Sequence, residues 1–385
     1  MSRFKSLFFI SLSFVLLLVT AGCVEKSSPS TSNSTTPADG GAEEEETIVL
    51  RASSGLPDHQ VWMKSIIFPW IERVEKETNG RVKFDVFTGG ELVTLGQEYD
   101  ALKAGTIDVA LPIMPLYDPS RFPLSEVTML PLVESDPKVM NEAFSKLIYG
   151  DYPIKDGKTF SELEYNSNGL KTWAMTGGNA YVISTTELDF DSAEDFKGAR
   201  IRTGARLSEL FINNIGASPI SMPQTDAYDA LSRGTIDGNL LSVSDWLGWG
   251  YTDLFKYTLT GANIGHFSAV FGMLEEKWNT IPADIQEIME TAAREIQISE
   301  EARAVMTEEY NNVMEAVEGK VKFETVDELE PDGKELVVGA MEKTWYDWIE
   351  LMEEAGQPGK ETAILWRDLV VEAGGKVPDA IMELE

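Results

Sequence analysis

A ten-residue segment occurs twice in this chain. Residues 99–108 read Tyr-Asp-Ala-Leu-Lys-Ala-Gly-Thr-Ile-Asp, and residues 228–237 repeat 8 of these 10 identities at an offset of 129. In each copy a helical run meets a glycine, Gly105 or Gly234, that suits a left-handed helix end, and a strand-like run follows. A helix that leads into a strand in this way, twice, predicts two similar α/β lobes. An alternative is that two doubly wound lobes merely share a packing motif.

The order of the remaining patterns predicts parallel sheets. Residues 47–52 alternate between apolar and polar side chains, an amphipathic helix is expected over 60–78, a second strand over 81–87 and a helix over 97–104. Such a β-α-β-α order implies a parallel sheet. Residues 199–203 are the expected first strand of the second lobe. The predicted fold class is therefore α/β, with two doubly wound lobes and a cleft between them.

Long-range elements complete this expected architecture. Residues 282–319 contain no internal glycine or proline, which predicts one helix of about 55 Å that spans both lobes. Residues 169–184 are expected to be one strand that crosses into the second lobe, and two more helices are expected near 333–354 and 361–373. Lobe I is expected over 47–172 with about 264–308, and lobe II over 173–263 with about 309–385.

The amino terminus has the pattern of an export signal. Arg3 and Lys5 precede an apolar run over 7–19, which is shorter than the roughly 20 residues that a membrane-spanning helix needs. Residues 20–23 resemble a lipoprotein processing box, so Cys23 is the expected lipidation site and membrane anchor; the alternative is that Cys23 is removed with the signal, residues 1–23. Residues 24–46 form an acidic Ser/Thr/Pro-rich linker that is expected to be flexible. An extracytoplasmic location follows.

Charge and residue counts exclude several functions. The net charge is −32, from 64 acidic and 32 basic residues, so nucleic-acid binding is not expected. The chain has two histidines and one cysteine, which offer no zinc-ligand cluster, and a catalytic triad would need one of those histidines. We therefore predict no catalytic residues, no metal site and no cofactor.

Arg202 is the main candidate binding residue. It ends the strand expected over 199–203, and ligands of open α/β sheets bind beyond the carboxyl ends of strands. A guanidinium there can hold both oxygens of a carboxylate. The alternative is a surface ion pair.

The same geometry places other candidates near the cleft. The repeated strands end at residues 111–114 and 239–242, which brings Met114, Asn239 and Leu241 to the cleft. His59 follows the first strand and is either a contact at the cleft mouth or a polar residue that starts a helix. Gly178 permits close approach of a ligand or forms a hinge or plain turn, and Asn179 follows it.

Several motifs from 195 to 238 occur in a specific order: Asp195-Phe196-Lys197-Gly198, Arg202, Gly216-Ala217-Ser218-Pro219, Met222-Pro223, Tyr228-Asp229-Ala230-Leu231 and Gly234-Thr235-Ile236-Asp237-Gly238. In this order they resemble the solute receptors of tripartite ATP-independent periplasmic (TRAP) transporters, the DctP-type family, and weaker similarity runs from about residue 48 to the carboxyl terminus. The resemblance implies a periplasmic-binding-protein fold with a long helix behind both lobes. It also implies two partners, the small and large membrane subunits of a sodium-coupled transporter.

The resemblance also bears on the ligand. Gln224 occupies a position where the family often has a ligand-lining side chain. Leu241 replaces an asparagine of acidic-sugar receptors, and a second arginine of those receptors, which would align near Gly178 or Asn179, is missing. We interpret this as a monocarboxylate ligand with an apolar body that contacts Leu241, Met114 and Trp246 or Trp249. The alternative is that these tryptophans belong to the core or the surface.

Two other functional classes stay open at this stage. One is a receptor for an ATP-driven importer or a sensor, which neighbouring genes would distinguish. The other is an exported lipoprotein enzyme, whose turnover would depend on His59.

Overall fold

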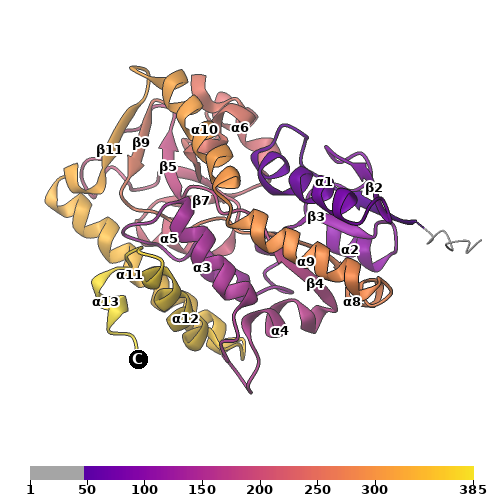
Figure 1. The fold of residues 1–385 in the computed structure, drawn as a ribbon. Coiled ribbons are helices and arrows are strands. Elements are labelled where there is room, and N and C mark those ends of the chain that lie inside the picture. The colour runs from indigo at the N-terminus through magenta and orange to yellow at the C-terminus, as the bar shows by residue number, and fades with distance from the viewer. Residues whose placement is uncertain (1–46) are drawn as a thin grey trace, which may run out of the picture. The chain divides into compact units, whose positions relative to one another are not determined.

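The computed structural model describes residues 47–385; the expected signal, Cys23 and the linker lie outside the described residues. Two β-sheets, one of five strands and one of six, organise this part of the chain. Figure 1 shows β2 and β3 in one region and β5, β9 and β11 in another, with helices packed around both.

The five-stranded sheet has the order β2-β1-β3-β10-β4. Strand β1 pairs in parallel with both β2 and β3, whereas β10 runs antiparallel to β3 and β4. The strands are β1 (Ile48–Ser53), β2 (Val82–Phe87), β3 (Val109–Ile113), β4 (Leu170–Ala174) and β10 (Val270–Leu274).

The six-stranded sheet has the order β11-β9-β5-β8-β6-β7. Strand β6 pairs in parallel with β7 and β8, β5 runs antiparallel to β8 and β9, and β11 is parallel to β9. The strands are β5 (Tyr181–Thr185), β6 (Arg200–Thr203), β7 (Ser218–Ser221), β8 (Gly238–Ser242), β9 (Tyr257–Thr260) and β11 (Lys322–Thr325).

The two sheets share one arrangement. In each, three parallel strands (β2-β1-β3 or β7-β6-β8) are followed by an antiparallel strand, β10 or β5, that comes from elsewhere in the chain. The two copies of the repeat occupy matching positions, because residues 99–108 lead into β3 and residues 228–237 lead into β8. The repeat therefore marks equivalent units in two lobes.

An arginine on the neighbouring strand explains the repeated aspartate. Arg51 on β1 donates from Nε to Asp108 Oδ2 (3.0 Å) and from Nη2 to the carbonyl oxygen of Gly105 (2.8 Å). Arg200 on β6 does the same with Asp237 Oδ2 (2.9 Å) and Gly234 (2.9 Å). Each arginine thus links its strand by hydrogen bonds to the repeated aspartate and to the glycine at the end of the repeated helix.

The helices are α1 (Phe68–Glu77), α2 (Glu98–Lys103), α3 (Pro137–Tyr149), α4 (Phe160–Glu164), α5 (Arg206–Asn214), α6 (Gln224–Ser232), α7 (Trp246–Trp249), α8 (Glu275–Trp278), α9 (Ala283–Gln297), α10 (Glu300–Val317), α11 (Pro331–Glu354), α12 (Gly359–Glu372) and α13 (Asp379–Met382). Short helical turns are η1 (Met63–Ile67), η2 (Pro115–Tyr117), η3 (Leu124–Met129), η4 (Asn166–Asn168), η5 (Val243–Asp245), η6 (Tyr251–Asp253) and η7 (Val326–Glu328).

The prediction of a single helix over 282–319 is wrong, because α9 ends at Gln297 and a new helix, α10, begins at Glu300. Ser299 caps the new helix: its hydroxyl accepts a hydrogen bond from the backbone N–H of Ala302 at 3.0 Å. A serine that satisfies a free N–H in this way favours a helix start over a helix interior. Figure 1 shows α9 beside α1, with α10 continuing in a different direction.

Helix α11 instead runs across both cores. Val337 and Met341 near its start pack in the core of the six-stranded sheet, whereas Trp345, Trp348 and Met352 belong to the core of the five-stranded sheet. Its 24 residues give a length of about 36 Å. Residues 309–385, which we expected in lobe II, therefore contribute to both cores.

Residues 169–184 form two strands and not one. Strand β4 closes the edge of the five-stranded sheet, and β5 lies inside the six-stranded sheet. Residues 175–180 connect them, and a second connection over 261–269 joins β9 back to β10. Across residues 47–385, no helix combines the length and the apolar character needed to cross a membrane.

Candidate ligand-binding site

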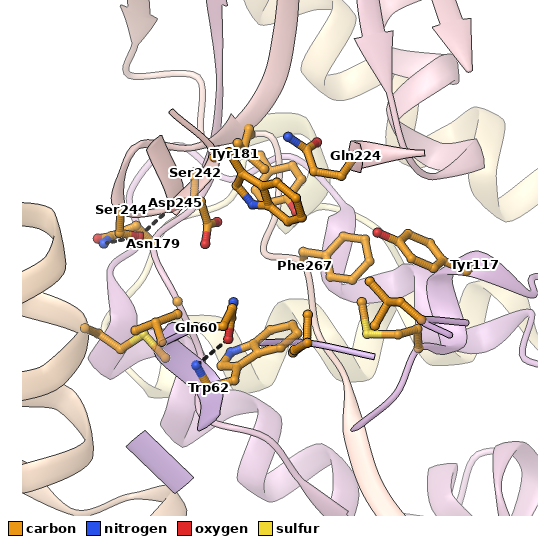
Figure 2. A pocket seen from close by; sticks show the side chains of 18 of the residues that line it. Gln60, Trp62, Tyr117, Asn179, Tyr181, Gln224, Ser242, Ser244, Asp245 and Phe267 are labelled. Atoms are coloured by element: carbon orange, nitrogen blue, oxygen red, sulfur yellow. Dashed lines mark hydrogen bonds between the residues drawn. The ribbon is translucent and has the colours of Figure 1, made fainter. Parts of the chain in front are cut away.

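A pocket lies where the carboxyl ends of strands from both sheets meet. Its walls come from the segments after β1, β2 and β3, from both connections between the sheets, from β5, β6 and β8, and from η5, α6, α7 and α10. Figure 2 shows these side chains around the pocket. The lining comprises Leu56, Gln60, Val61, Trp62, Leu95, Met114, Tyr117, Gly178, Asn179, Tyr181, Arg202, Gln224, Leu241, Ser242, Ser244, Asp245, Trp249, Phe267 and Met306.

Arg202 supplies a buried positive charge to this lining. The residue is only 2% exposed, and its Nε donates to the carbonyl oxygen of Met222 at 3.0 Å. Within residues 47–385 it forms no ion pair with a carboxylate. Because a buried, unpaired charge is unfavourable by several kcal/mol, an anion in the pocket would satisfy a group that the protein leaves uncompensated.

Gly204 makes room for this guanidinium. A β-carbon at position 204 would lie 2.6 Å from Nη2 and 3.0 Å from Cζ of Arg202, closer than van der Waals contact allows. The glycine is needed here for space and not for an unusual backbone angle. Any side chain at 204 would displace the arginine head group.

Gln224 and Tyr117 place further polar atoms near Arg202. Gln224 begins α6, and its Nε2 donates to the hydroxyl of Tyr251 at 2.5 Å, which leaves Oε1 without a partner among the described residues. Tyr117 follows β3, and Figure 2 shows its hydroxyl directed into the pocket. Burial raises the pKa of this hydroxyl, and the charge of Arg202 opposes that shift.

Aromatic rings form the apolar wall. Phe267, on the connection between β9 and β10, stacks on Tyr181 at 5.8 Å and 18° and meets Tyr117 edge-on at 5.5 Å. Trp62 packs on the ring of Phe267 at a centroid distance of 6.4 Å, and its indole N–H donates to the carbonyl oxygen of Thr176 at 2.9 Å. Rings fixed in this way offer a flat apolar surface to a ligand.

A polar group closes the other side of the pocket. The hydroxyls of Ser242 and Ser244 lie 2.7 Å apart, and Asn179 Nδ2 donates to Ser244 Oγ at 3.3 Å. Asp245 is next to them (Figure 2), and its carboxylate has no hydrogen bond or ion pair in the described part of the chain. Burial, followed by the charge of Glu309, raises the pKa of Asp245 to about 7.

His266 holds the two connections together beneath the pocket. Its Nδ1 donates to the carbonyl oxygen of Gly178 at 2.9 Å, and its Nε2 lies 2.6 Å from the hydroxyl of Ser135. Burial lowers the pKa of His266 to about 4, so the ring is neutral at physiological pH. This histidine therefore positions Gly178 and does not line the pocket.

Six of the nine predicted site residues line the pocket: Met114, Gly178, Asn179, Arg202, Gln224 and Leu241. Asn239 does not, because it lies buried two residues earlier on β8. Trp246 packs in the core on Phe255 and Phe323, and Trp249 lines the pocket in its place. His59 lines a smaller adjoining pocket with Asp245, Trp249 and Glu309.

The pocket is also lined by residues that were not predicted from the sequence, among them Trp62, Tyr117, Tyr181, Asp245 and Phe267. Tyr117 had a usable signal, since it follows Met114 just beyond the repeated strand. Phe267 and Tyr181 had none, because their positions depend on which sheet each connecting segment joins. Among residues 47–385, no three His, Cys, Asp or Glu side chains are grouped so that they could hold a metal ion.

Two α/β lobes with a pocket between the carboxyl ends of their strands are the architecture of the periplasmic-binding-protein type. A family model described as "Bacterial extracellular solute-binding protein, family 7" (DctP) matches residues 52–350. The chain belongs to this family, the solute receptors of TRAP transporters, which confirms the resemblance and the two-lobed α/β fold predicted from the sequence.

Individual proteins show the same relationship. The chain is 26% identical over 249 residues to the C4-dicarboxylate-binding periplasmic protein DctP of Rhodobacter capsulatus, covering 64% of this chain and 70% of that protein. A TRAP solute-binding protein from Rhodoferax ferrireducens with copurified benzoate matches with a TM-score of 0.72 and 21% identity, over 85% of this chain and 98% of the other.

A marine metagenome TRAP solute-binding protein, described as specific for aromatic acid ligands and bound to 3-hydroxybenzoate, gives a TM-score of 0.73 at 20% identity, over 86% and 99% of the two chains. At these identities the structural similarity shows the fold and does not identify the ligand of this protein.

Proposed function

We propose that this protein is an extracytoplasmic receptor that captures an organic monocarboxylate with an apolar body, and that Arg202 holds the carboxylate. The observation that carries the proposal is a guanidinium 2% exposed, in a pocket wall, without a carboxylate partner in the described residues. Its planar fork matches the two oxygens of a carboxylate. The free Oε1 of Gln224 lies in the same lining and can accept a hydrogen bond from a ligand.

The apolar part of the pocket supports a ligand with a ring or an aliphatic body. Phe267, Tyr181 and Trp62 form one wall, and Leu241 and Met114 add aliphatic surface. Apolar area buried in this way contributes about 25 cal/mol per Å². The benzoate and 3-hydroxybenzoate bound to the two similar receptors are ligands of this kind.

Delivery to a membrane partner follows from the family. TRAP receptors work with membrane transporter subunits, so we infer that the closed, ligand-bound form of this protein is what those subunits recognise. We also infer that the export signal places it outside the cytoplasm and that lipidated Cys23 anchors it. The role is capture and delivery, without covalent chemistry.

Native mass spectrometry of the protein purified from its own host tests this function, because a buried ligand can be retained. We expect a bound small carboxylic acid. Calorimetric titration with benzoate and galacturonate then compares an apolar with a polyhydroxylated acid. Benzoate should bind more tightly; tight galacturonate binding together with no benzoate binding would contradict the apolar-body proposal.

A further inference from the structure

We propose that Asp245 is a second polar anchor of the pocket, and that the natural ligand carries a hydrogen-bond donor, a hydroxyl or an ammonium group, away from its carboxylate. This inference rests on the proposed capture of a carboxylate by Arg202 and adds the chemistry of the ligand's other end.

Asp245 lies at the end of η5, directly after β8, so its position is set by a strand end in the same way as that of Arg202. Its carboxylate accepts no hydrogen bond within residues 47–385, and the start of α7, which it precedes, receives no side-chain cap from it. A carboxylate in a pocket wall without a donor is the counterpart of the arginine there, which has no carboxylate partner.

The two charges do not neutralise each other. The Asp245 carboxylate forms no ion pair with Arg202. Burial raises the pKa of Tyr181 and of Tyr251, and the charges of Asp245 and Arg202 act on both pKa values in opposite directions. The pocket therefore presents a positive group and a negative group that are separated. A ligand with only a carboxylate would satisfy Arg202 and leave Asp245 beside an added negative charge.

None of the described charged groups around Asp245 donates a hydrogen bond to its carboxylate. Glu309 on α10 lines the adjoining pocket together with Asp245, and Lys64 is already paired with Glu309 at 2.8 Å. His59 lines that adjoining pocket as well. No described lysine or arginine pairs with Asp245 itself. The raised pKa of Asp245 agrees with a carboxylate that lacks a partner in the unliganded protein.

The neighbouring polar side chains can complete a donor site. Ser242 and Ser244 share a hydrogen bond of 2.7 Å, and Asn179 donates to Ser244, so both hydroxyls are already oriented. Figure 2 shows Asn179, Ser242, Ser244 and Asp245 together on one side of the pocket, with Tyr117 and Gln224 on the other. A hydroxyl on the ligand could donate to Asp245, and an ammonium group would add charge pairing.

The test is calorimetric titration at pH 8 with five probes: benzoate, its 3- and 4-hydroxy derivatives, and its 3- and 4-aminomethyl derivatives. We expect at least one donor-bearing probe to bind wild-type protein at least tenfold more tightly than benzoate. The hydroxy and aminomethyl series distinguish an alcohol from an ammonium ligand.

Asp245→Asn should reduce the preference for an aminomethyl probe to less than threefold and should raise benzoate affinity, because the negative charge beside the bound carboxylate is removed. The preference for a hydroxy probe should fall but persist in part, because the asparagine Oδ1 can still accept a hydrogen bond. Asp253→Asn, which removes an exposed charge on the nearby turn η6, is the matched control and should preserve the preference. Equal binding of all probes by the wild type, or an unchanged preference in Asp245→Asn, would overturn the role of Asp245.

Failure of the proposed function has a different signature. If Arg202→Ala leaves the affinity of all five probes unchanged, the carboxylate clamp is refuted. If no probe binds the wild type, the proposed capture of a monocarboxylate with an apolar, ring-shaped body is refuted. If Asp245→Asn does not fold, titration of the wild type at pH 8 and at pH 6 replaces it as the test. The affinity for the preferred donor probe should fall at least threefold from pH 8 to pH 6, whereas the affinity for benzoate should not fall. A pH-independent preference would refute the inference. His59→Gln controls for the histidine that lines the adjoining pocket.

Discussion

Arg206 at the start of α5 holds the fully buried carboxylate of Glu126 in η3, donating from Nε to Oε1 at 3.1 Å and from Nη2 to Oε2 at 2.5 Å. Trp348 on α11 donates to the same Oε2 at 3.3 Å. This pair joins a helix that follows a strand of the six-stranded sheet to a segment in the core of the five-stranded sheet. It is one of the polar links between the two lobes.

Removing Arg206 should therefore destabilise the protein. Arg206→Ala leaves the Glu126 carboxylate buried without its cation, a change that costs about 3–5 kcal/mol for fully buried pairs. Because 35% of the Arg206 side chain is exposed, we expect the lower end of that range in the free energy of unfolding. Arg233→Ala, which breaks the exposed pair with Asp229, is the control and should cost less than about 1 kcal/mol. Equal losses in urea denaturation would contradict this assignment.

The space at Gly204 gives a second prediction. Gly204→Ala should weaken carboxylate binding at least tenfold, because the new β-carbon would lie 2.6 Å from Nη2 of Arg202 and push the guanidinium from its place. Gly248→Ala is the matched control, since no atom lies within 4 Å of the β-carbon that it adds. Calorimetry should show near-wild-type affinity for the control. A Gly204→Ala protein that binds normally would contradict the prediction and show that the guanidinium can move aside without losing the ligand.

Glu164 predicts a pH dependence of stability. Burial raises the pKa of Glu164 to about 8, although Ser125 donates its backbone N–H to the carboxyl at 2.6 Å. Between about pH 4.3, where an unfolded glutamate ionises, and about pH 8, the folded state binds the proton more tightly than the unfolded state. The contribution of this group to the free energy of unfolding therefore falls as pH rises through that window.

Glu164→Gln should flatten the loss of stability between pH 6.5 and 8.5 and should be the more stable protein at pH 8.5. Glu187→Gln, at an exposed position, should retain the wild-type profile. Denaturant titrations at several pH values measure both. An identical slope in the Glu164→Gln protein would show that this carboxyl is ionised in the folded state.

Local patterns in the sequence predicted much of this structure. The starts of both lobes, the repeated helix and strand, and the pocket positions of Arg202 and Met114 follow from period, caps and the carboxyl ends of strands, whereas Gln224 came from the family resemblance. These features depend on residues within one β-α unit. A single sequence is therefore sufficient to place them.

Long-range pairing could not be predicted in the same way. Strands β10 and β5 each join a sheet made mostly of distant residues, so the meeting of Phe267 and Tyr181 depends on contacts far apart in sequence. The absence of internal glycine and proline over 282–319 favoured one helix, but Ser299 caps a new helix within that range. Trp246 and Trp249 lie three positions apart, and only tertiary packing decides that the first is core and the second lines the pocket.

The measurement that tests the central claim most directly is calorimetric titration of the wild type, Arg202→Ala and Arg202→Lys with the carboxylate found in the purified protein. We expect Arg202→Ala to lose more than tenfold in affinity, since truncating one partner of a desolvated charge pair costs about 2–5 kcal/mol. Arg202→Lys should recover only part, because an ammonium lacks the fork. Unchanged affinity in Arg202→Ala, with the fold intact by circular dichroism, would contradict the account.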